Sequence, residues 1–260
     1  MTKGILIVGY GTRTGNLTDI LESQAARLRA RGRKNIYVSY FRISEPTIPD
    51  AIAKMAADGI DDVLAIPYYI AEGRMTLELI PEKLGIGHTS HGVADIGGRK
   101  VKVTVAPAFG RTRMLTNILT DRIAQAGGSK DTGILVIGHG SRDMHDSNRE
   151  IVELNARRLG DMGYRHVAYG FNEFCGPEIS DALASLAKET DEVIVTPLFI
   201  ANGVHLGEEI AEKLGISNYS KGGKVDIGGK MICVKYMAPV EDDVRLLESI
   251  DAKVADFYGE

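Results

Sequence analysis

Residues 4–13 read GILIVGYGTR, and residues 133–142 read GILVIGHGSR. Two more pairs follow in the same order: IPYYIAEGRMTLELIPEKLGI at 66–86 returns as TPLFIANGVHLGEEIAEKLGI at 196–216, and DIGG starts at 95 and again at 226. The members of each pair lie about 130 residues apart, which indicates a duplicated unit. We therefore expect two similar domains, residues 1–128 and 129–260, joined at a Gly- and Ser-containing stretch.

Each copy alternates short apolar runs with helical patterns. The runs are rich in β-branched residues, as is typical of strands buried on both faces of a parallel sheet. They lie at residues 5–8, 36–40, 63–66 and 101–106, and again near 134–137, 167–169, 192–195 and 232–236. Helical patterns in the first copy lie at residues 17–31, 49–57, 76–84 and 112–126. This alternation predicts an α/β fold with two doubly wound parallel sheets.

Composition excludes several classes of protein. The net charge is −4 in 260 residues, whereas a nucleic-acid-binding surface would need a basic face. No apolar run approaches the roughly 18 residues of a membrane span, and the first apolar run is too short for a signal peptide, so we expect a cytoplasmic protein. The only two cysteines, Cys175 and Cys233, are far apart and predict neither a disulfide framework nor a structural zinc site.

Three polar side chains follow successive predicted strands of the second copy. His139 follows the first strand, Glu173 the second and His205 the third. Ligands of open parallel sheets bind at the carboxyl ends of the strands, so these side chains are expected at one edge. Two neutral imidazoles with a carboxylate suit a borderline divalent ion such as Co²⁺, Fe²⁺ or Ni²⁺, and the same groups can accept protons.

The first copy lacks all three of these groups. Tyr10, Arg42 and Met75 stand at the matched positions. A single histidine after a strand is more often a structural residue than a ligand. The loss of the whole set from one copy favours a functional set in the other copy.

The motifs around these residues resemble a known family. GHGSR at 138–142, EFCGP at 173–177 and FIANGVHLGEEI at 199–210 are similar to the class II chelatases of the CbiX type, which insert a divalent metal into sirohydrochlorin. The resemblance covers nearly the whole chain and implies chelatase-like domains related by a pseudo-twofold axis, with the macrocycle in a cleft between them. It implies that His139 and His205 act on the metal and the pyrrole protons, with Glu173 as their carboxylate partner.

The resemblance also implies a substrate that carries carboxylates. Their expected anchors are the backbone amides after Gly140 and Ser141, the Arg142 guanidinium, and Asn202 with Gly203. Ser141 could instead cap a helix, and Arg142 could be a solvated first-turn charge.

The resemblance implies a cobaltochelatase-type lyase, because family usage favours Co²⁺, with a ferrochelatase or nickelochelatase as the alternatives. The metal is a substrate, no organic cofactor is expected, and we expect a monomer with pseudo-dimeric domains. A non-catalytic tetrapyrrole or metal carrier is the alternative from another class. A phosphate-binding loop at GHGSR is disfavoured, since the sequence lacks the GxxxxGK[ST] and GxGxxG spacings.

The sequence does not assign a role to three further residues. His88 and His91 have an HxxH spacing but fall in a Gly-rich stretch, so a surface pair is expected. Cys175 lies two residues from Glu173 and could add a soft metal ligand, although a small buried thiol is the commoner case.

Overall fold

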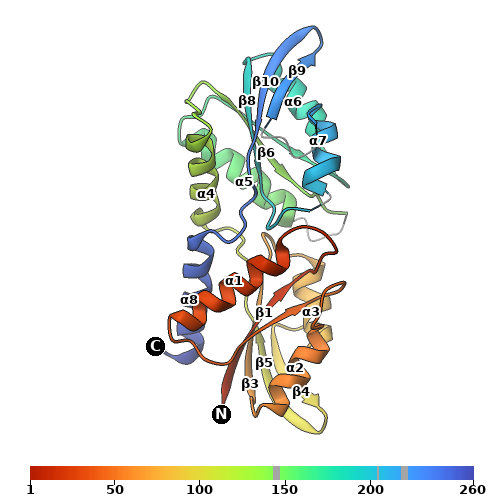
Figure 1. Cartoon of the computed structure of the whole chain (residues 1–260), viewed down its shortest axis with the longest axis vertical. Coiled ribbons are helices and arrows are strands. Elements are labelled where there is room, and N and C mark those ends of the chain that lie inside the picture. Colours follow the sequence, from red (N-terminus) through yellow and green to blue (C-terminus); the bar gives the residue numbers. More distant parts are fainter. Residues whose placement is uncertain (143–146, 204, 218–221) are drawn as a thin grey trace. The chain divides into compact units, whose positions relative to one another are not determined.

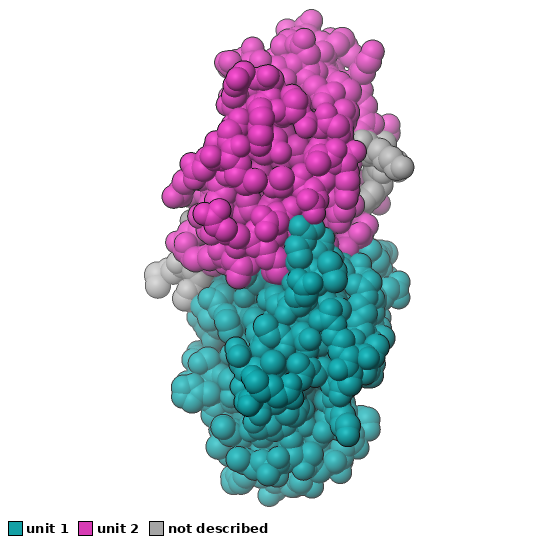
Figure 2. Space-filling model, turned by 90° about the vertical axis from the view of Figure 1, so that its left-hand side faces the viewer, with its two compact units in different colours: residues 1–110, 242–260 teal, residues 111–241 magenta. Residues whose placement is uncertain are grey.

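A computed structural model describes residues 1–142, 147–203, 205–217 and 222–260, except for the side chain of residue 205. The chain folds into two compact units. Unit 1 comprises Met1–Gly110 with Asp242–Glu260, and unit 2 comprises Arg111–Glu241 (Figure 2).

The sheet of unit 1 has five strands in the order β2-β1-β3-β5-β4. Its strands are β1 (Lys3–Gly9), β2 (Ile36–Tyr40), β3 (Asp62–Pro67), β4 (His91–Ile96) and β5 (Arg99–Val105). Its helices are α1 (Leu17–Ala30), α2 (Ile48–Ala57), the π-helix η1 (Met75–Leu79) running into α3 (Ile80–Lys83), and α8 (Val244–Tyr258). The interior strand β1 is buried from its second residue onward, because helices cover both faces of the sheet.

Unit 2 repeats this sheet in the order β7-β6-β8-β10-β9. Its strands are β6 (Gly133–Gly138), β7 (His166–Phe171), β8 (Glu192–Pro197), β9 (Gly222–Ile227) and β10 (Lys230–Tyr236). Its helices are α4 (Arg113–Gln125), α5 (Ser147–Asp161), α6 (Ile179–Ala187), and the π-helix η2 (His205–Glu209) running into α7 (Ile210–Lys213). The predicted α/β fold with two similar sheets is confirmed.

Both sheets contain one strand that was not expected. β4 and β9 pair antiparallel with β5 and β10, so each sheet is mostly and not wholly parallel. DIGG is the hairpin turn in both copies: the Asp95 carboxylate accepts a hydrogen bond from Gly98 N at 2.9 Å, and the Asp226 carboxylate accepts one from Gly229 N at 2.7 Å. His91 therefore begins an edge strand and does not lie in a loop.

The compact units differ from the sequence repeats by one helix each. α8 ends the second repeat, yet it packs on α1 and β3 of unit 1 (Figure 1). Lys3 Nζ there donates a hydrogen bond to Phe257 O at 2.5 Å. α4 ends the first repeat but packs on β8 and α5 of unit 2, where Thr116 donates to Asn155 at 2.7 Å in the core. Each repeat therefore supplies its last helix to the unit built on the other repeat.

None of the described helices is both long enough and apolar enough to cross a membrane.

Candidate active site

His139 is the first residue after β6, at the carboxyl end of an interior strand of the unit 2 sheet. Its side chain is half-buried, and Nδ1 lies 3.3 Å from Gly140 O. The imidazole is 5.6 Å from the Phe174 ring and 6.4 Å from the Phe199 ring between centroids. Aromatic neighbours therefore fix the imidazole at the strand end.

Glu173 lies in the loop between β7 and α6, and backbone hydrogen bonds fasten this loop to the end of β6. Asn172 N donates to Gly138 O, and Glu173 N donates to His139 O, both at 2.9 Å. Gly140 makes the close approach possible, since its φ is +91° and a Cβ there would stand 1.9 Å from Glu173 O. The structure thus brings the backbones of His139 and Glu173 together, as the strand-end argument predicts.

Phe174 is a neighbour of this site that sequence reasoning missed. Its φ is +69°, which is uncommon for a residue with a side chain, and the residue is 45% exposed. The Arg142 guanidinium carbon lies 4.4 Å from the ring centroid, in a cation–π arrangement. An apolar residue in a polar loop was the available signal, although such residues more often belong to a core.

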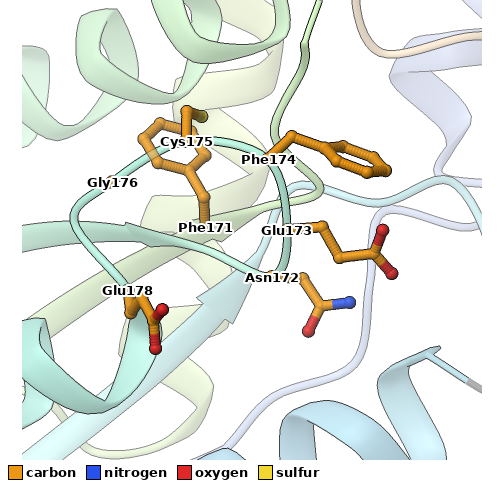
Figure 3. Close-up of a pocket in the computed structure, with 7 residues that line it drawn as sticks. All are labelled: Phe171, Asn172, Glu173, Phe174, Cys175, Gly176 and Glu178. Atoms are coloured by element: carbon orange, nitrogen blue, oxygen red, sulfur yellow. The ribbon is translucent and has the colours of Figure 1, made fainter.

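The β7–α6 loop also borders a pocket of about 320 Å³. The described residues that line it are Phe171, Asn172, Glu173, Phe174, Cys175, Gly176 and Glu178 (Figure 3). The side chains of Asn172, Glu173 and Phe174 extend to one side of the loop, whereas that of Cys175 points away from Glu173. Cys175 Sγ lies 3.3 Å from the place where a Gly140 Cβ would stand. The thiol thus packs against the loop after β6, which favours a structural role.

His205 begins η2, at the position where Met75 begins η1 in unit 1. The His205 side chain lies outside the described residues. The far end of this helical segment is connected to the Glu173 loop: Asn172 Nδ2 donates to Glu209 Oε2 at the end of η2, at 3.1 Å, and Lys213 Nζ at the end of α7 donates to Asn172 O. Single-turn π-helices often occur at functional sites.

Asn202 and Gly203 precede η2 in the loop after β8. Asn202 Nδ2 donates to Glu241 Oε1 at 2.9 Å, and Glu241 N donates to Ile200 O at 2.8 Å. Gly203 O accepts a hydrogen bond from Gly207 N at 2.9 Å within the first turn of η2. These residues therefore join the loop after β8 to the segment after β10.

The expected carboxylate anchors after β6 are described only in part. Gly140 N donates to Asn148 Oδ1 at 2.9 Å, so that amide is already bonded within the unit. Ser141 is half-buried and Arg142 is exposed. Residues 143–146, which precede α5, lie outside the described residues, and the helix start expected there is among them.

Among the described side chains, no three of His, Cys, Asp and Glu are close enough to hold a metal ion together. The His205 imidazole is not among these described side chains. His88 and His91 have exposed side chains in unit 1, and His88 Nε2 lies 3.9 Å from Glu82 Oε2. The described HxxH pair is thus a surface feature, as expected.

The corresponding loops at the strand ends of unit 1 have the same backbone hydrogen bond but different side chains. Arg42 N donates to Tyr10 O at 3.0 Å, and a Cβ on Gly11 would stand 1.8 Å from Arg42 O. The side chains here are a phenol and a guanidinium: Arg42 Nη2 donates to the Tyr10 hydroxyl. Equal loop geometry therefore supports a carboxylate beside an imidazole in unit 2 and a cation beside a phenol in unit 1.

A family model described as CbiX matches the chain twice, over residues 4–126 and 133–256. The chain belongs to the CbiX family. The two matches coincide with the two sequence repeats, which confirms the duplication and the resemblance recognised in its motifs.

Two relatives and one solved structure show what this CbiX chain is similar to. It is 27% identical over 147 residues to the sirohydrochlorin cobaltochelatase of Methanopyrus kandleri, in an alignment covering 49% of this chain and 97% of the relative. It is 22% identical over 228 residues to the probable sirohydrochlorin cobaltochelatase of Halobacterium salinarum, covering 81% and 76%. The structure of SirB from Bacillus subtilis with Fe³⁺ shares the fold, with a TM-score of 0.75 at 17% identity over 100% of this chain and 98% of SirB.

Proposed function

We propose that this CbiX-family protein inserts a divalent metal ion into sirohydrochlorin, with Co²⁺ as the physiological metal and Fe²⁺ or Ni²⁺ as the alternatives. The observation that carries the proposal is the one-sided site: unit 2 joins an imidazole loop, a carboxylate loop and η2 by hydrogen bonds, while unit 1 keeps the backbone without those side chains. The names of the relatives agree with this reaction.

The reaction replaces two pyrrole N–H bonds by two nitrogen–metal bonds and releases two protons. We assign the incoming ion to the neutral imidazoles of His139 and His205, which leave positions open for the ring nitrogens. The two ring nitrogens that carry protons displace the two imidazoles, and each freed imidazole accepts one pyrrole proton. Glu173 offsets the positive charge that builds up during this exchange. The Arg142 guanidinium and Asn202 anchor substrate carboxylates, and Phe174 packs on the ring.

Substitution of the two histidines tests the proposal. We expect His139→Ala and His205→Ala each to lower the insertion rate by about 100-fold or more, since each removes a ligand and a base. Product absorbance under anaerobic conditions measures the rate, and circular dichroism checks the fold. His166→Ala, at the start of β7, and Met75→Leu, at the position matched to His205, are the controls. Wild-type rates in both site variants would exclude this assignment.

The same assay separates the remaining alternatives. Insertion rates for Co²⁺, Fe²⁺ and Ni²⁺ compare the metals, although the intrinsic affinity order favours Ni²⁺ over Co²⁺ over Fe²⁺ in any nitrogen and oxygen site. A preference for Co²⁺ against that order would support the cobalt assignment. Tetrapyrrole binding without turnover for any of the three metals would identify a carrier.

A further inference from the structure

Unit 1 carries a cluster of aromatic and cationic side chains where unit 2 carries the candidate active site. Tyr10 stacks on Phe41 at 6.2 Å between ring centroids. The Arg42 guanidinium carbon lies 4.7 Å from the Tyr10 ring centroid, and Lys83 Nζ lies 4.9 Å from that of Phe41. Phe41 and Tyr69 both pack against one hydrophobic core cluster of unit 1. We call Tyr10, Phe41, Arg42, Tyr69 and Lys83 the cationic cluster.

The cluster differs from its counterpart in unit 2 in its charge and in its aromatic side chains. Arg42 stands where unit 2 has Glu173, so the local charge is inverted. Tyr69 stands where unit 2 has Phe199, so unit 1 gains a phenol at the end of the third strand. These changes favour a negatively charged ligand in unit 1, where the unit 2 site favours a cation.

Among the described residues, the cluster has one unsatisfied hydroxyl and no carboxylate paired with its cations. The Tyr69 hydroxyl is buried and has no hydrogen-bond partner among the described residues, a costly condition for a polar group. Burial raises the pKa of Tyr69, and the positive charge of Arg42 opposes this rise. Among the described residues, neither Arg42 nor Lys83 forms an ion pair with a carboxylate, whereas Arg74 nearby pairs with Glu78 at 3.5 Å.

We propose that the cationic cluster of unit 1 binds a carboxylate of the tetrapyrrole substrate. A carboxylate accepts hydrogen bonds from the guanidinium and from the buried phenol, and Lys83 adds a second positive charge. The stacked rings of Tyr10 and Phe41 provide the apolar surface beside it. The inference rests on the proposed function for the identity of the ligand, and it gives the copy without histidines a role in holding substrate.

Binding of metal-free sirohydrochlorin to the full-length protein tests the inference without any metal insertion. We expect Arg42→Gln to raise Kd about tenfold or more, because a charge-assisted hydrogen bond is lost. Tyr69→Phe is expected to raise Kd several-fold while the melting temperature stays equal or rises, since it removes a buried hydroxyl that lacks a protein partner. A purely structural role for Tyr69 predicts no change in Kd.

The control for charge is Arg99→Gln. Arg99 is an exposed arginine at the start of β5. It therefore lies at the amino ends of the parallel strands, whereas the cationic cluster lies at their carboxyl ends. We expect Arg99→Gln to bind like the wild type. At equal ionic strength, sodium acetate should weaken binding to the wild type more than sodium chloride does, and this difference should disappear in Arg42→Gln.

If Arg42→Gln and Tyr69→Phe bind the tetrapyrrole with the same Kd as the control Arg99→Gln, the inference is overturned. The absence of tetrapyrrole binding by the wild type would also overturn it. If Arg42→Gln does not fold, Tyr69→Phe decides alone. Insertion is measured on the same samples at saturating tetrapyrrole. A wild type that binds in an Arg42-dependent way but inserts no metal would refute the proposed reaction and leave the carboxylate site standing.

Discussion

At the scale of single residues, Phe174 has a strained backbone conformation beside the candidate active site. Its φ of +69° is matched by +74° at Ile43 in unit 1, and both side chains are about half exposed. A β-branched residue at positive φ is strained, and such strain persists where the surrounding structure and the function require it. The same loop thus presents an apolar side chain in both units.

A glycine at residue 174 separates strain from function. Phe174→Gly removes both the strained φ and the ring that contacts His139 and Arg142. We expect affinity for metal-free sirohydrochlorin to fall several-fold, while relief of strain of about 1 kcal/mol offsets the loss of packing in the melting temperature. Ile43→Gly is the matched change in unit 1. A loss of stability without a loss of affinity in Phe174→Gly would mean that the ring serves packing alone.

At the scale of elements, the sequence predicted the strands whose burial leaves a continuous apolar run. β1 and β6 are of this kind, since helices cover both of their faces. β4 and β9 were missed because they are edge strands with at most one buried residue each, and they leave no apolar run. The strand-end rule placed His139 and Glu173 correctly, whereas nothing local in the sequence revealed the hydrogen bond that joins Asn172 to Glu209.

The loop after β6 gives a prediction about one glycine. We expect Gly140→Ala to destabilise the protein by at least about 2 kcal/mol and to lower insertion, because its Cβ would overlap Glu173 O. Gly160→Ala near the end of α5 is the control, since nothing lies within 4 Å of a Cβ there, and it should stabilise by roughly 0.5–1 kcal/mol. Thermal unfolding measures both. A neutral Gly140→Ala would show that the two loops separate easily.

Lys253 on α8 gives a prediction about pH. Burial lowers its pKa from 10.5 to about 8, and Glu72 opposes that shift only in part. Between these values the unfolded state binds more protons than the folded state, so the contribution of Lys253 to stability rises with pH. Below about pH 8 the lysine is charged in both states and burial penalises folding.

The comparison with Lys253→Met isolates this contribution. Methionine keeps the chain length without the charge and loses the hydrogen bond from Nζ to Pro107 O, which is 2.6 Å long. We expect the melting temperature of the wild type to rise relative to that of Lys253→Met between about pH 7 and pH 10. A difference that stays constant over this range would mean that the ammonium is solvated in the folded state.

At the scale of the whole molecule, the exchange of α4 and α8 is the feature that the sequence could not predict. The helical patterns of both segments are the same whichever sheet they cover, so their local sequence carries no information about the partner. The Methanopyrus kandleri relative aligns over 97% of its length with only half of this chain. A single repeat that gives its last helix to a second copy would form a symmetric dimer, and duplication of such a dimer produces the arrangement seen here.

Two fragments that contain the same candidate site residues but begin and end at different positions test this origin. Residues 111–241 form unit 2 complete with α4, whereas residues 132–260 lack α4 and carry α8 without the sheet that it covers in the full chain. We expect the first fragment to be folded and monomeric. We expect the second to dimerise by exchange of α8, because α8 then covers the face of the other copy that α4 has left bare, or to aggregate through that face.

Both fragments contain His139, Glu173 and His205, so sedimentation and an insertion assay on the same samples relate assembly to activity. Insertion by the second fragment should accompany its dimer, and residues 1–129 should be inactive in every state. A monomeric 132–260 fragment as stable and as active as the full chain would show that neither the helix exchange nor the first repeat is needed.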